Sequence, residues 1–210
     1  MSEKVIPFYG SEQSKLFEIE RRCMDRDGLV IRHLNDELPK GRVLDIGAGN
    51  GFTADLLTSP SRTVFPFEPS WEMINTQMVV PWSRGVAQEL PFSTHAFDGV
   101  YATWAFFLNG VAGIEDGLSE AKRVTRPGGT IVIVDNAGND EFCALSPRPI
   151  TSNRNFWLER SFKETIIETS WKFSNGEEAK ELLCYFFGEI DFDPQKIEYT
   201  YRVAAYSKQV

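Results

Sequence analysis

The sequence predicts an α/β fold in which helices cover both faces of a mostly parallel sheet. Residues 43–46 suit a strand buried on both faces, and a glycine-rich turn and a helix start follow them. The apolar run at 130–135 suits the centre of a sheet, and segments with strand and helix periods alternate between the two. The 210 residues fit one domain with a substantial core.

Two amphipathic helices are expected before the first strand. Leu16, Ile19 and Cys23 recur at helical spacing in a helix that starts near Ser11, and a second helix ends before residue 41. We expect residues 1–39 to form a helical lid segment over the sheet edge. Phe8 and Tyr9 would then either close over a ligand or anchor the terminus, and Tyr9 is a candidate substrate-binding residue.

The first strand leads into a turn that is built for close approach of a ligand. Asp45 ends the strand, and Gly47, Gly49 and Gly51 follow at alternate positions. Glycine tolerates positive φ and places no Cβ in a ligand's way, and the helix N-terminus beyond attracts an anionic group. A turn with glycines for packing alone is the plainer alternative. A dinucleotide-binding turn would place its third glycine one residue later.

A second acidic residue is expected beside that turn. Glu68 follows the strand at 63–67, and a right-handed βαβ unit brings it next to the glycines. A carboxylate there can accept both hydroxyl hydrogens of a ribose. Ser70 is a candidate N-cap for a following helix, and Met73 on that helix would pack against an adenine ring or in the core.

These segments resemble the motifs of class I S-adenosylmethionine-dependent methyltransferases. Val43-Leu-Asp-Ile-Gly-Ala-Gly-Asn-Gly51 is similar to the first motif, Glu68-Pro-Ser-Trp-Glu-Met to the second, and residues 85–92 to the third. The resemblance covers 41–135 strongly and the remainder weakly. It implies a single domain over 1–210 with a Rossmann-like three-layer sandwich. The sheet would have seven strands in the order 3-2-1-4-5-7-6, with an antiparallel C-terminal strand.

The resemblance also implies S-adenosyl-L-methionine as cofactor. The residues that match cofactor-binding positions are Asp45, Gly47, Ala48, Gly49, Asn50, Gly51, Glu68, Pro69, Ser70, Met73, Ala87, Gln88, Glu89, Ala102 and Thr103. Val86 stands where the family commonly carries an aspartate, and valine cannot accept a hydrogen bond from the adenine amino group. Gln88 or Glu89 would replace that acceptor, or Gln88 is simply a surface residue.

The acceptor side is predicted from the segment after the fourth strand, residues 97–108. In the family this segment faces the methyl group, which nominates Trp104 and Phe107 as substrate-binding residues. Phe107 stands where many relatives carry histidine, so no general base is evident, and no catalytic residue is assigned. Asp135 and Asn136 follow a strand end and would face the acceptor or cap the next loop. Trp157 is a further candidate for an apolar or aromatic acceptor pocket.

The remaining elements follow from local signals. A helix over 115–124, a tight turn at 126–129 and the strand at 130–135 come first. Residues 139–155 read as loop, and 137–162 match an acceptor-side insertion of the family. A strand over 163–173, a helix opened by Ser174-Asn175 and closed by Gly188, and a strand over 197–206 complete the chain.

Composition limits the partners. A net charge of −8 argues against a broad nucleic-acid footprint. Cys23, Cys143 and Cys184 are scattered, as in a cytoplasmic protein with reduced thiols, and we expect no metal site. No apolar run reaches the length of a membrane span, and the first residues lack a signal-peptide pattern. A small-molecule acceptor is therefore expected.

The sequence thus predicts methyl transfer to a small-molecule acceptor by in-line displacement. Two alternatives remain open. Val86 and Phe107 leave room for a non-catalytic, cofactor-binding regulatory module, and a nicotinamide-dependent oxidoreductase would use a related sheet.

Overall fold

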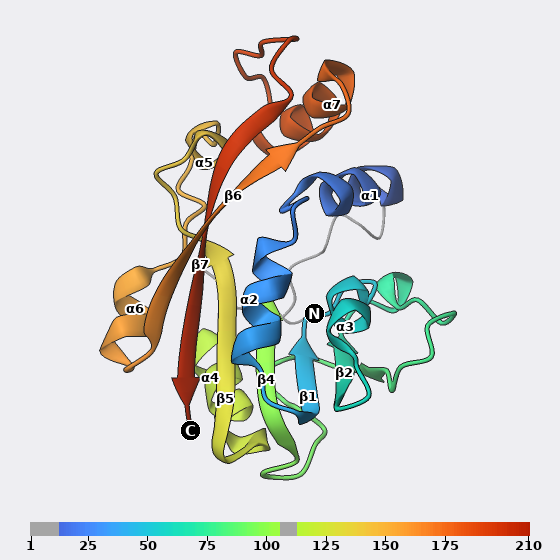
Figure 1. Ribbon diagram of the computed structural model, residues 1–210, viewed down its shortest axis with the longest axis vertical. Helices are drawn as coiled ribbons and strands as arrows, with labels where there is room; N and C mark the ends of the chain where they lie inside the picture. Colours follow the sequence, from blue (N-terminus) through green and yellow to red (C-terminus); the bar gives the residue numbers. More distant parts are fainter. Residues whose placement is uncertain (1–12, 106–112) are drawn as a thin grey trace.

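The computed structural model describes residues 13–105 and 113–210, which form a sheet with helices on both faces (Figure 1). The strands are β1 (Gly41–Ile46), β2 (Arg62–Glu68), β3 (Ser83–Arg84), β4 (Phe97–Thr103), β5 (Thr125–Asn136), β6 (Lys163–Lys172) and β7 (Glu198–Gln209). The helices are α1 (Ser14–Cys23), α2 (Leu29–Glu37), α3 (Phe52–Leu57), α4 (Ile114–Val124), α5 (Glu141–Ala144), α6 (Arg154–Glu159) and α7 (Gly176–Phe187).

The described strands form one seven-stranded sheet in the order β3-β2-β1-β4-β5-β7-β6. Neighbours from β3 to β5 pair in parallel, and β7 is antiparallel to both β5 and β6. The predicted fold class and strand order are therefore confirmed. Because β1 pairs with β2 on one side and β4 on the other, the chain changes winding direction there, and a crevice is expected beyond the carboxyl ends of these strands.

Two hydrophobic cores lie on opposite faces of the sheet, as alternation along the strands requires. In β1 Val43 belongs to one core and Leu44 to the other, and in β5 Val132 and Ile133 divide in the same way. The first core contains residues of α1, α2, α3 and α7, and the second contains residues of α4 and α6. This arrangement produces three layers from one chain.

Helix α1 connects the N-terminal segment to the C-terminal part of the sheet. Its apolar face, Leu16, Ile19 and Cys23, is buried. On its other side Lys15 Nζ lies 2.8 Å from Glu181 Oε1 of α7, and Arg22 pairs with Glu178. The Arg22 guanidinium lowers the pKa of Glu178 to about 2 through this hydrogen bond. The predicted helix start near Ser11 lies outside the described residues. The lid role of 1–39 stays a prediction.

The segment after β2 differs from the prediction. The expected helix from Ser70 is a single 3₁₀ turn, η2 (Trp71–Met73), and the Ser70 side chain makes no capping hydrogen bond. Its hydroxyl lies 2.9 Å from Glu72 Oε2 instead. The prediction of a Ser70-capped helix is therefore wrong, because the hydroxyl bonds a side chain and the chain turns away after Met73. Residues 126–129, expected as a turn before a strand, lie within β5.

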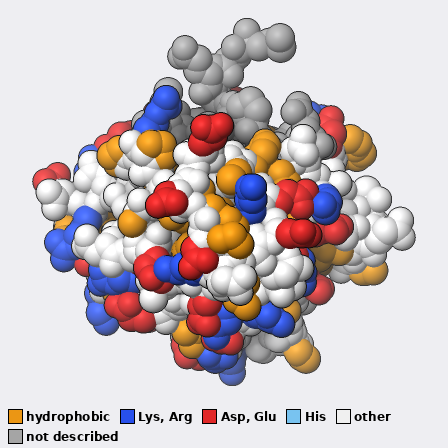
Figure 2. Space-filling model, turned by 90° about the horizontal axis from the view of Figure 1, so that it is seen from above, with side chains coloured by type: hydrophobic (Ala, Val, Ile, Leu, Met, Phe, Trp, Pro, Cys, Tyr) orange, Lys and Arg blue, Asp and Glu red, His pale blue; other side chains and the backbone are white. Residues whose placement is uncertain are grey.

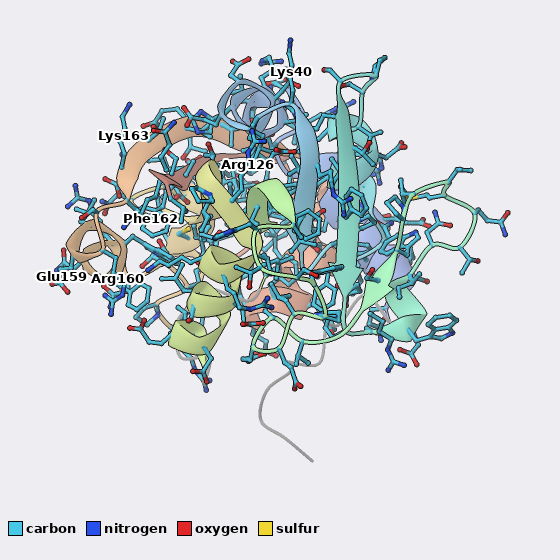
Figure 3. The ribbon with its side chains drawn as sticks, turned by 90° about the horizontal axis from the view of Figure 1, so that it is seen from below. Lys40, Arg126, Glu159, Arg160, Phe162 and Lys163 are labelled. Carbon is cyan, nitrogen blue, oxygen red and sulfur yellow. The ribbon has the colours of Figure 1, made fainter. Side chains whose placement is uncertain are left out.

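Residues 137–162 fold as loops around α5 and α6. Asp140 Oδ1 accepts a hydrogen bond from Cys143 N, and Asn153 Oδ1 accepts one from Phe156 N, so both short helices are capped. Trp157 is buried in the second core, where its ring lies 5.1 Å from that of Phe162. Seen from below, Phe162 lies between the end of α6 and the start of β6 (Figure 3).

The described parts of the chain contain neither a candidate membrane-spanning helix nor a cluster of metal-ligating side chains. None of the helices in 13–105 and 113–210 combines the length and the apolar composition that a bilayer crossing requires. Over the same residues, no three His, Cys, Asp or Glu side chains come together as a metal site would need.

Candidate functional site

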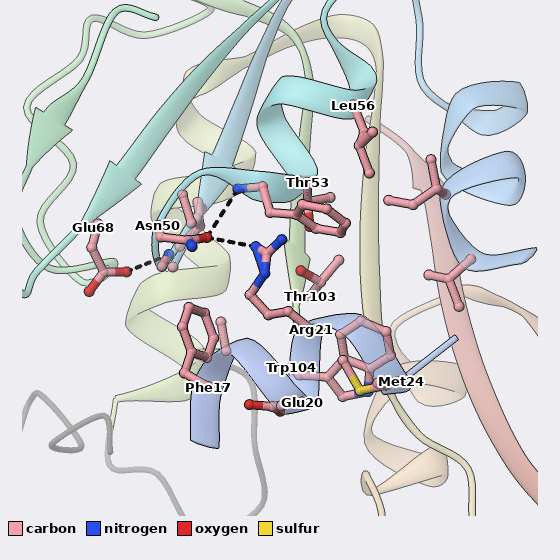
Figure 4. A pocket seen from close by; sticks show the side chains of 18 of the residues that line it. Phe17, Glu20, Arg21, Met24, Asn50, Thr53, Leu56, Glu68, Thr103 and Trp104 are labelled. Carbon is pink, nitrogen blue, oxygen red and sulfur yellow. Dashed lines mark hydrogen bonds between the residues drawn. The ribbon is translucent and has the colours of Figure 1, made fainter. Parts of the chain in front are cut away.

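A cavity of about 1000 Å³ lies at the carboxyl ends of β1, β2 and β4. The turns after these strands form its floor, and α1, α2 and α3 contribute the facing wall. Phe17, Arg21, Met24 and Leu56 project from this wall (Figure 4), and Ile31 of α2 also lines the cavity. Figure 2 looks onto this end of the molecule, where apolar side chains lie among charged groups of both signs. The volume is at the upper end of the usual range for small-molecule sites.

The glycine-rich turn is held in a left-handed conformation. Gly47, Gly49 and Gly51 have φ of 75°, 55° and 82°. The turn is anchored to β2, because Gly47 N and Ala48 N donate to Phe67 O at 2.8 and 3.1 Å. A Cβ on Gly49 would project into the cavity, with Phe17 Cζ, at 3.7 Å, as its nearest neighbour. Close approach of a ligand to this backbone therefore depends on glycine.

Gly51 has a different requirement. A Cβ there would lie 2.8 Å from Trp82 Cζ2, so the position needs glycine for packing, and Gly51 is not among the cavity-lining residues. Gly47, Ala48, Gly49 and Asn50 do line the cavity, as predicted from the motif. Their contact with a cofactor stays a prediction.

Glu68 fixes the turn from the next strand. Its Oε2 accepts from Gly49 N at 2.9 Å and its Oε1 accepts from Ser70 N at 2.9 Å (Figure 4). The carboxylate lines the cavity although only 5% of the residue is exposed. Burial raises the pKa of Glu68, and the two backbone hydrogen bonds oppose that shift. Each carboxylate oxygen can accept a further hydrogen bond.

Asp45 lies beneath the turn and not in the cavity lining. Its Oδ2 accepts from Tyr101 Oη at 2.8 Å, and its Oδ1 is buried without a hydrogen-bond partner among the described residues. Burial raises the pKa of Asp45 to about 7, with a smaller contribution from the nearby charge of Glu68. The two acidic residues are thus close together, as expected, but only Glu68 faces the cavity.

The end of the cavity beside β3 is lined by Pro69, Gly85, Val86 and Ala87. Gln88 and Glu89 do not line it, so the expectation that one of them replaces the missing aspartate finds no support in the geometry. Ser70 and Met73 also lie outside the lining, and Met73 is buried. Val86 itself therefore presents an apolar surface where the motif would place a carboxylate.

The other end of the cavity is formed after β4. Thr103 and Trp104 line it, whereas Ala102 is buried in the second core. Trp104 has a φ of 44°, unusual for a bulky residue. Its backbone N donates to Val134 O at 2.9 Å, and its Nε1 donates to Tyr201 Oη at 2.6 Å. Two long-range contacts thus hold Trp104 in a strained conformation at the cavity wall.

Asp135 and Asn136 are not among the described cavity-lining residues, and their contact with an acceptor stays a prediction. The Asn136 side chain accepts from Tyr201 Oη and donates to Ile150 O at 2.8 Å, which ties the loop to the sheet. Asp135 is buried, and burial raises its pKa to about 7. Trp157 is buried in the second core and is not among the described cavity-lining residues. The predictions for Phe8, Tyr9 and Phe107 lie outside the described residues.

The wall that α1 to α3 contribute was not specifically predicted from the sequence. Arg21, Phe17 and Phe52 come together there, although only the general expectation that 1–39 covers the site pointed to it. The sequence signal that could have indicated this wall is the position of Arg21 beside the apolar face of α1. No residue of the insertion 137–162 is among the described cavity-lining residues, and its acceptor-side role stays a prediction.

The fold and a family match support the resemblance to class I S-adenosylmethionine-dependent methyltransferases that was seen in the sequence. Residues 44–133 match the family model described as a methyltransferase domain. A demethylmenaquinone methyltransferase of Mycobacterium sp. (strain KMS) is 36% identical over 99 residues, which are 46% of this chain and 42% of that protein. The chain therefore spans less than half the length of this curated relative.

Solved structures show the same fold at lower identity. The YcgJ protein from Bacillus subtilis superimposes with a TM-score of 0.57 at 18% identity, covering 86% of this chain and 95% of that chain. A SAM-dependent methyltransferase from Thermotoga maritima gives a TM-score of 0.57 at 19% identity, covering 94% and 95%. At these identities the likeness establishes the architecture, and the family match implies S-adenosylmethionine as the cofactor.

Proposed function

We propose that this protein transfers a methyl group from S-adenosylmethionine to a small, apolar or aromatic acceptor by in-line displacement. The observation that carries the proposal is that one cavity brings together the positive-φ backbone at Gly49, the Glu68 carboxylate and the Trp104 wall. Its volume of about 1000 Å³ is large enough for a nucleoside and a second small molecule.

The described residues fit the cofactor. Glu68 retains acceptor capacity for ribose hydroxyls, and the absence of a Cβ at Gly49 lets a ligand approach this part of the cavity lining closely. The apolar surface of Val86 and Ala87 suits one face of an adenine ring. When bound, the cofactor supplies an activated methyl group, whose bond to sulfur breaks as the bond to the acceptor forms.

The contribution of the chain to this reaction is placement. Holding two reactants in near-attack geometry can lower a barrier by about 7–11 kcal/mol. A general base adds about 10²–10⁴-fold. Because Asp135 is buried away from the cavity, we assign it no role in taking the acceptor proton. The proposal therefore favours acceptors that release a proton readily to water.

The acceptor class rests on the apolar side chains beyond the glycine-rich turn. Met24, Ile31, Leu34, Leu56 and Trp104 line that part of the cavity. One relative is named for demethylmenaquinone. The free thiols among the described residues, Cys23, Cys143 and Cys184, fit a cytoplasmic protein within this proposal.

Calorimetry with S-adenosylhomocysteine tests the proposal. We expect micromolar binding by the wild type and at least about tenfold weaker binding by Glu68→Ala, since the ribose would lose charge-assisted hydrogen bonds. Asp45→Ala, which removes the buried carboxylate beneath the turn, should also weaken binding. A wild type that stays silent at millimolar ligand would refute the proposal.

Turnover separates enzyme from binding module. A panel of small aromatic acceptors with labelled S-adenosylmethionine should give a methylated product detectable by mass spectrometry. Cofactor binding without any product would favour the regulatory module. A thermal shift with NAD that exceeds the shift with S-adenosylhomocysteine would favour the oxidoreductase.

A further inference from the structure

Arg21 occupies an unusual position in the wall contributed by α1. Its guanidinium carbon lies 3.4 Å from the ring centroid of Phe52 and 5.6 Å from that of Phe17. Burial lowers the pKa of Arg21 to about 10, which still leaves the side chain charged at neutral pH. Two aromatic rings from α1 and α3 thus hold a largely desolvated cation at the cavity surface.

No described carboxylate forms an ion pair with Arg21, although the charges of Glu20 and Glu18 on the same helix partly offset the effect of burial on its pKa. Other arginines of the chain are paired directly, as Arg22 is with Glu178 and Arg202 is with Glu168. No described carboxylate lies within 4 Å of the Arg21 guanidinium, and its hydrogen bond goes to the neutral amide oxygen of Asn50 at 2.7 Å. A half-buried guanidinium with five donors and one neutral acceptor can therefore still take an anion in direct contact.

The contacts of Arg21 and Glu68 with one turn indicate where an anionic part of a ligand would lie. Gly49 N is bonded to the Glu68 carboxylate, and the next residue, Asn50, is bonded to Arg21. Arg21 and Glu68 therefore contact adjacent residues of the same turn. Figure 4 shows Arg21 between the Asn50 turn and Thr103, with Glu68 at one side and Trp104 at the other.

We propose that Arg21 binds the carboxylate at the amino-acid end of the cofactor, with Phe17 and Phe52 holding the guanidinium flat for the contact. This assignment rests on the proposed function, because it takes the ribose to be at Glu68. An amino-acid tail that leaves the ribose there and runs along the turn toward Thr103 passes Arg21. The carboxylate oxygens would accept hydrogen bonds from the Arg21 N–H groups and would place a negative charge in direct contact with the guanidinium.

The test pairs a deletion in the protein with the same deletion in the ligand. S-adenosyl-3-thiopropylamine is S-adenosylhomocysteine without its carboxylate. Calorimetry measures both ligands on the wild type, Arg21→Gln and Arg21→Lys. We expect Arg21→Gln to weaken S-adenosylhomocysteine by about 10- to 100-fold and to change the decarboxylated ligand by less than about threefold. Arg21→Lys should give an intermediate loss, since lysine keeps the charge without the planar fork.

Lys15→Gln is the matched control. It removes one positive charge from the same helix, but Lys15 pairs with Glu181 on the side that faces α7. We expect this variant to bind both ligands as the wild type does. A thermal melt of every variant establishes that the fold is retained, and the wild type alone already reports the carboxylate's contribution as the ratio of its two affinities.

Two results would overturn the assignment. One is a wild type that binds the two ligands equally, and the other is an Arg21→Gln loss that is the same for both. Either would leave the methyltransferase proposal standing, because S-adenosylhomocysteine still binds. Failure of the proposed function is a different outcome, in which the wild type binds neither ligand.

Discussion

The two ends of the cavity are built in different ways. Over β1 and β2 the polar groups are backbone amides of one turn and the carboxylate of Glu68, all from residues close in the parallel βαβ unit. Over β4 and β5 the wall depends on a side-chain network in which Trp104 bonds Tyr201, 97 residues further along the chain. The first end is set by local backbone conformation, whereas the second is set by strand pairing across the sheet.

This difference suggests that the two ends of the cavity bind different parts of the reacting pair. Backbone groups cannot be altered by most substitutions, so the end near Gly49 suits a ligand part that is always the same. Side chains can be exchanged one at a time, so the end near Trp104 suits an acceptor that varies among relatives. The following predictions test this contrast.

Gly49→Ala should have the largest effect. The added Cβ meets no protein atom closer than 3.7 Å, yet it projects into the space that a ligand would fill. We expect affinity for S-adenosylhomocysteine to fall by about 100-fold, with a stability cost of about 1 kcal/mol from positive φ. Gly128→Ala is the matched control, with a φ of 78° and open space around its Cβ. It should lose similar stability and no affinity; equal affinity losses would contradict the role of the turn.

Asp135→Asn tests the buried carboxyl group behind the second end. Its folded-state pKa of about 7 lies above the ordinary value of 3.8, so between these pH values the folded state holds a proton that the unfolded state has released. Wild-type stability should therefore decline as pH rises through this window. Between pH 5 and pH 8 the free energy of unfolding of Asp135→Asn should fall by about 2–3 kcal/mol less than that of the wild type, as measured by urea unfolding.

The matched substitution for this measurement is Asp191→Asn, because Asp191 is exposed in a loop. That variant should follow the wild-type pH profile. A profile for Asp135→Asn that parallels the wild type would show that burial does not retain a proton on Asp135.

Tyr201→Phe should destabilise the second end more modestly. The substitution removes the acceptor of Trp104 Nε1 and the donor to Asn136 Oδ1, and the expected loss is about 1–2 kcal/mol in the free energy of unfolding. Tyr199→Phe on the same strand provides the comparison, since Tyr199 makes no side-chain hydrogen bond among the described residues. If both variants unfold at the same urea concentration, the network does not hold Trp104.

Val86→Asp should have the smallest effect and the opposite sign. Val86 lines the cavity where the family commonly has an aspartate, so the variant adds an acceptor for the adenine amino group. We expect about three- to tenfold tighter binding of S-adenosylhomocysteine. The gain should vanish with S-inosylhomocysteine, which lacks that amino group. A gain with both ligands would place the adenine elsewhere.

Much of the fold could be predicted because its signals are local. The apolar run of β1, the alternation in β6 and the Asn175 cap of α7 each operate within a few residues, and all are present. The helix expected after Ser70 failed because local propensity is weak where no apolar face requires burial. Likewise, the strand-end position of Asp135 suggested a ligand contact, but its side chain is enclosed by the sheet.

The sequence by itself determined the glycine-rich turn and the placement of Glu68 beside it, because glycine conformation and parallel βαβ handedness follow from residues close along the chain. The strand order was predicted from the resemblance of the motifs to the methyltransferase family. Only the tertiary structure decided that Asp45 lies beneath the cavity, that Tyr201 holds Trp104, and that Arg21 of α1 faces Asn50. These contacts join segments 29 to 97 residues apart, and their geometry depends on how helices and strands pack together.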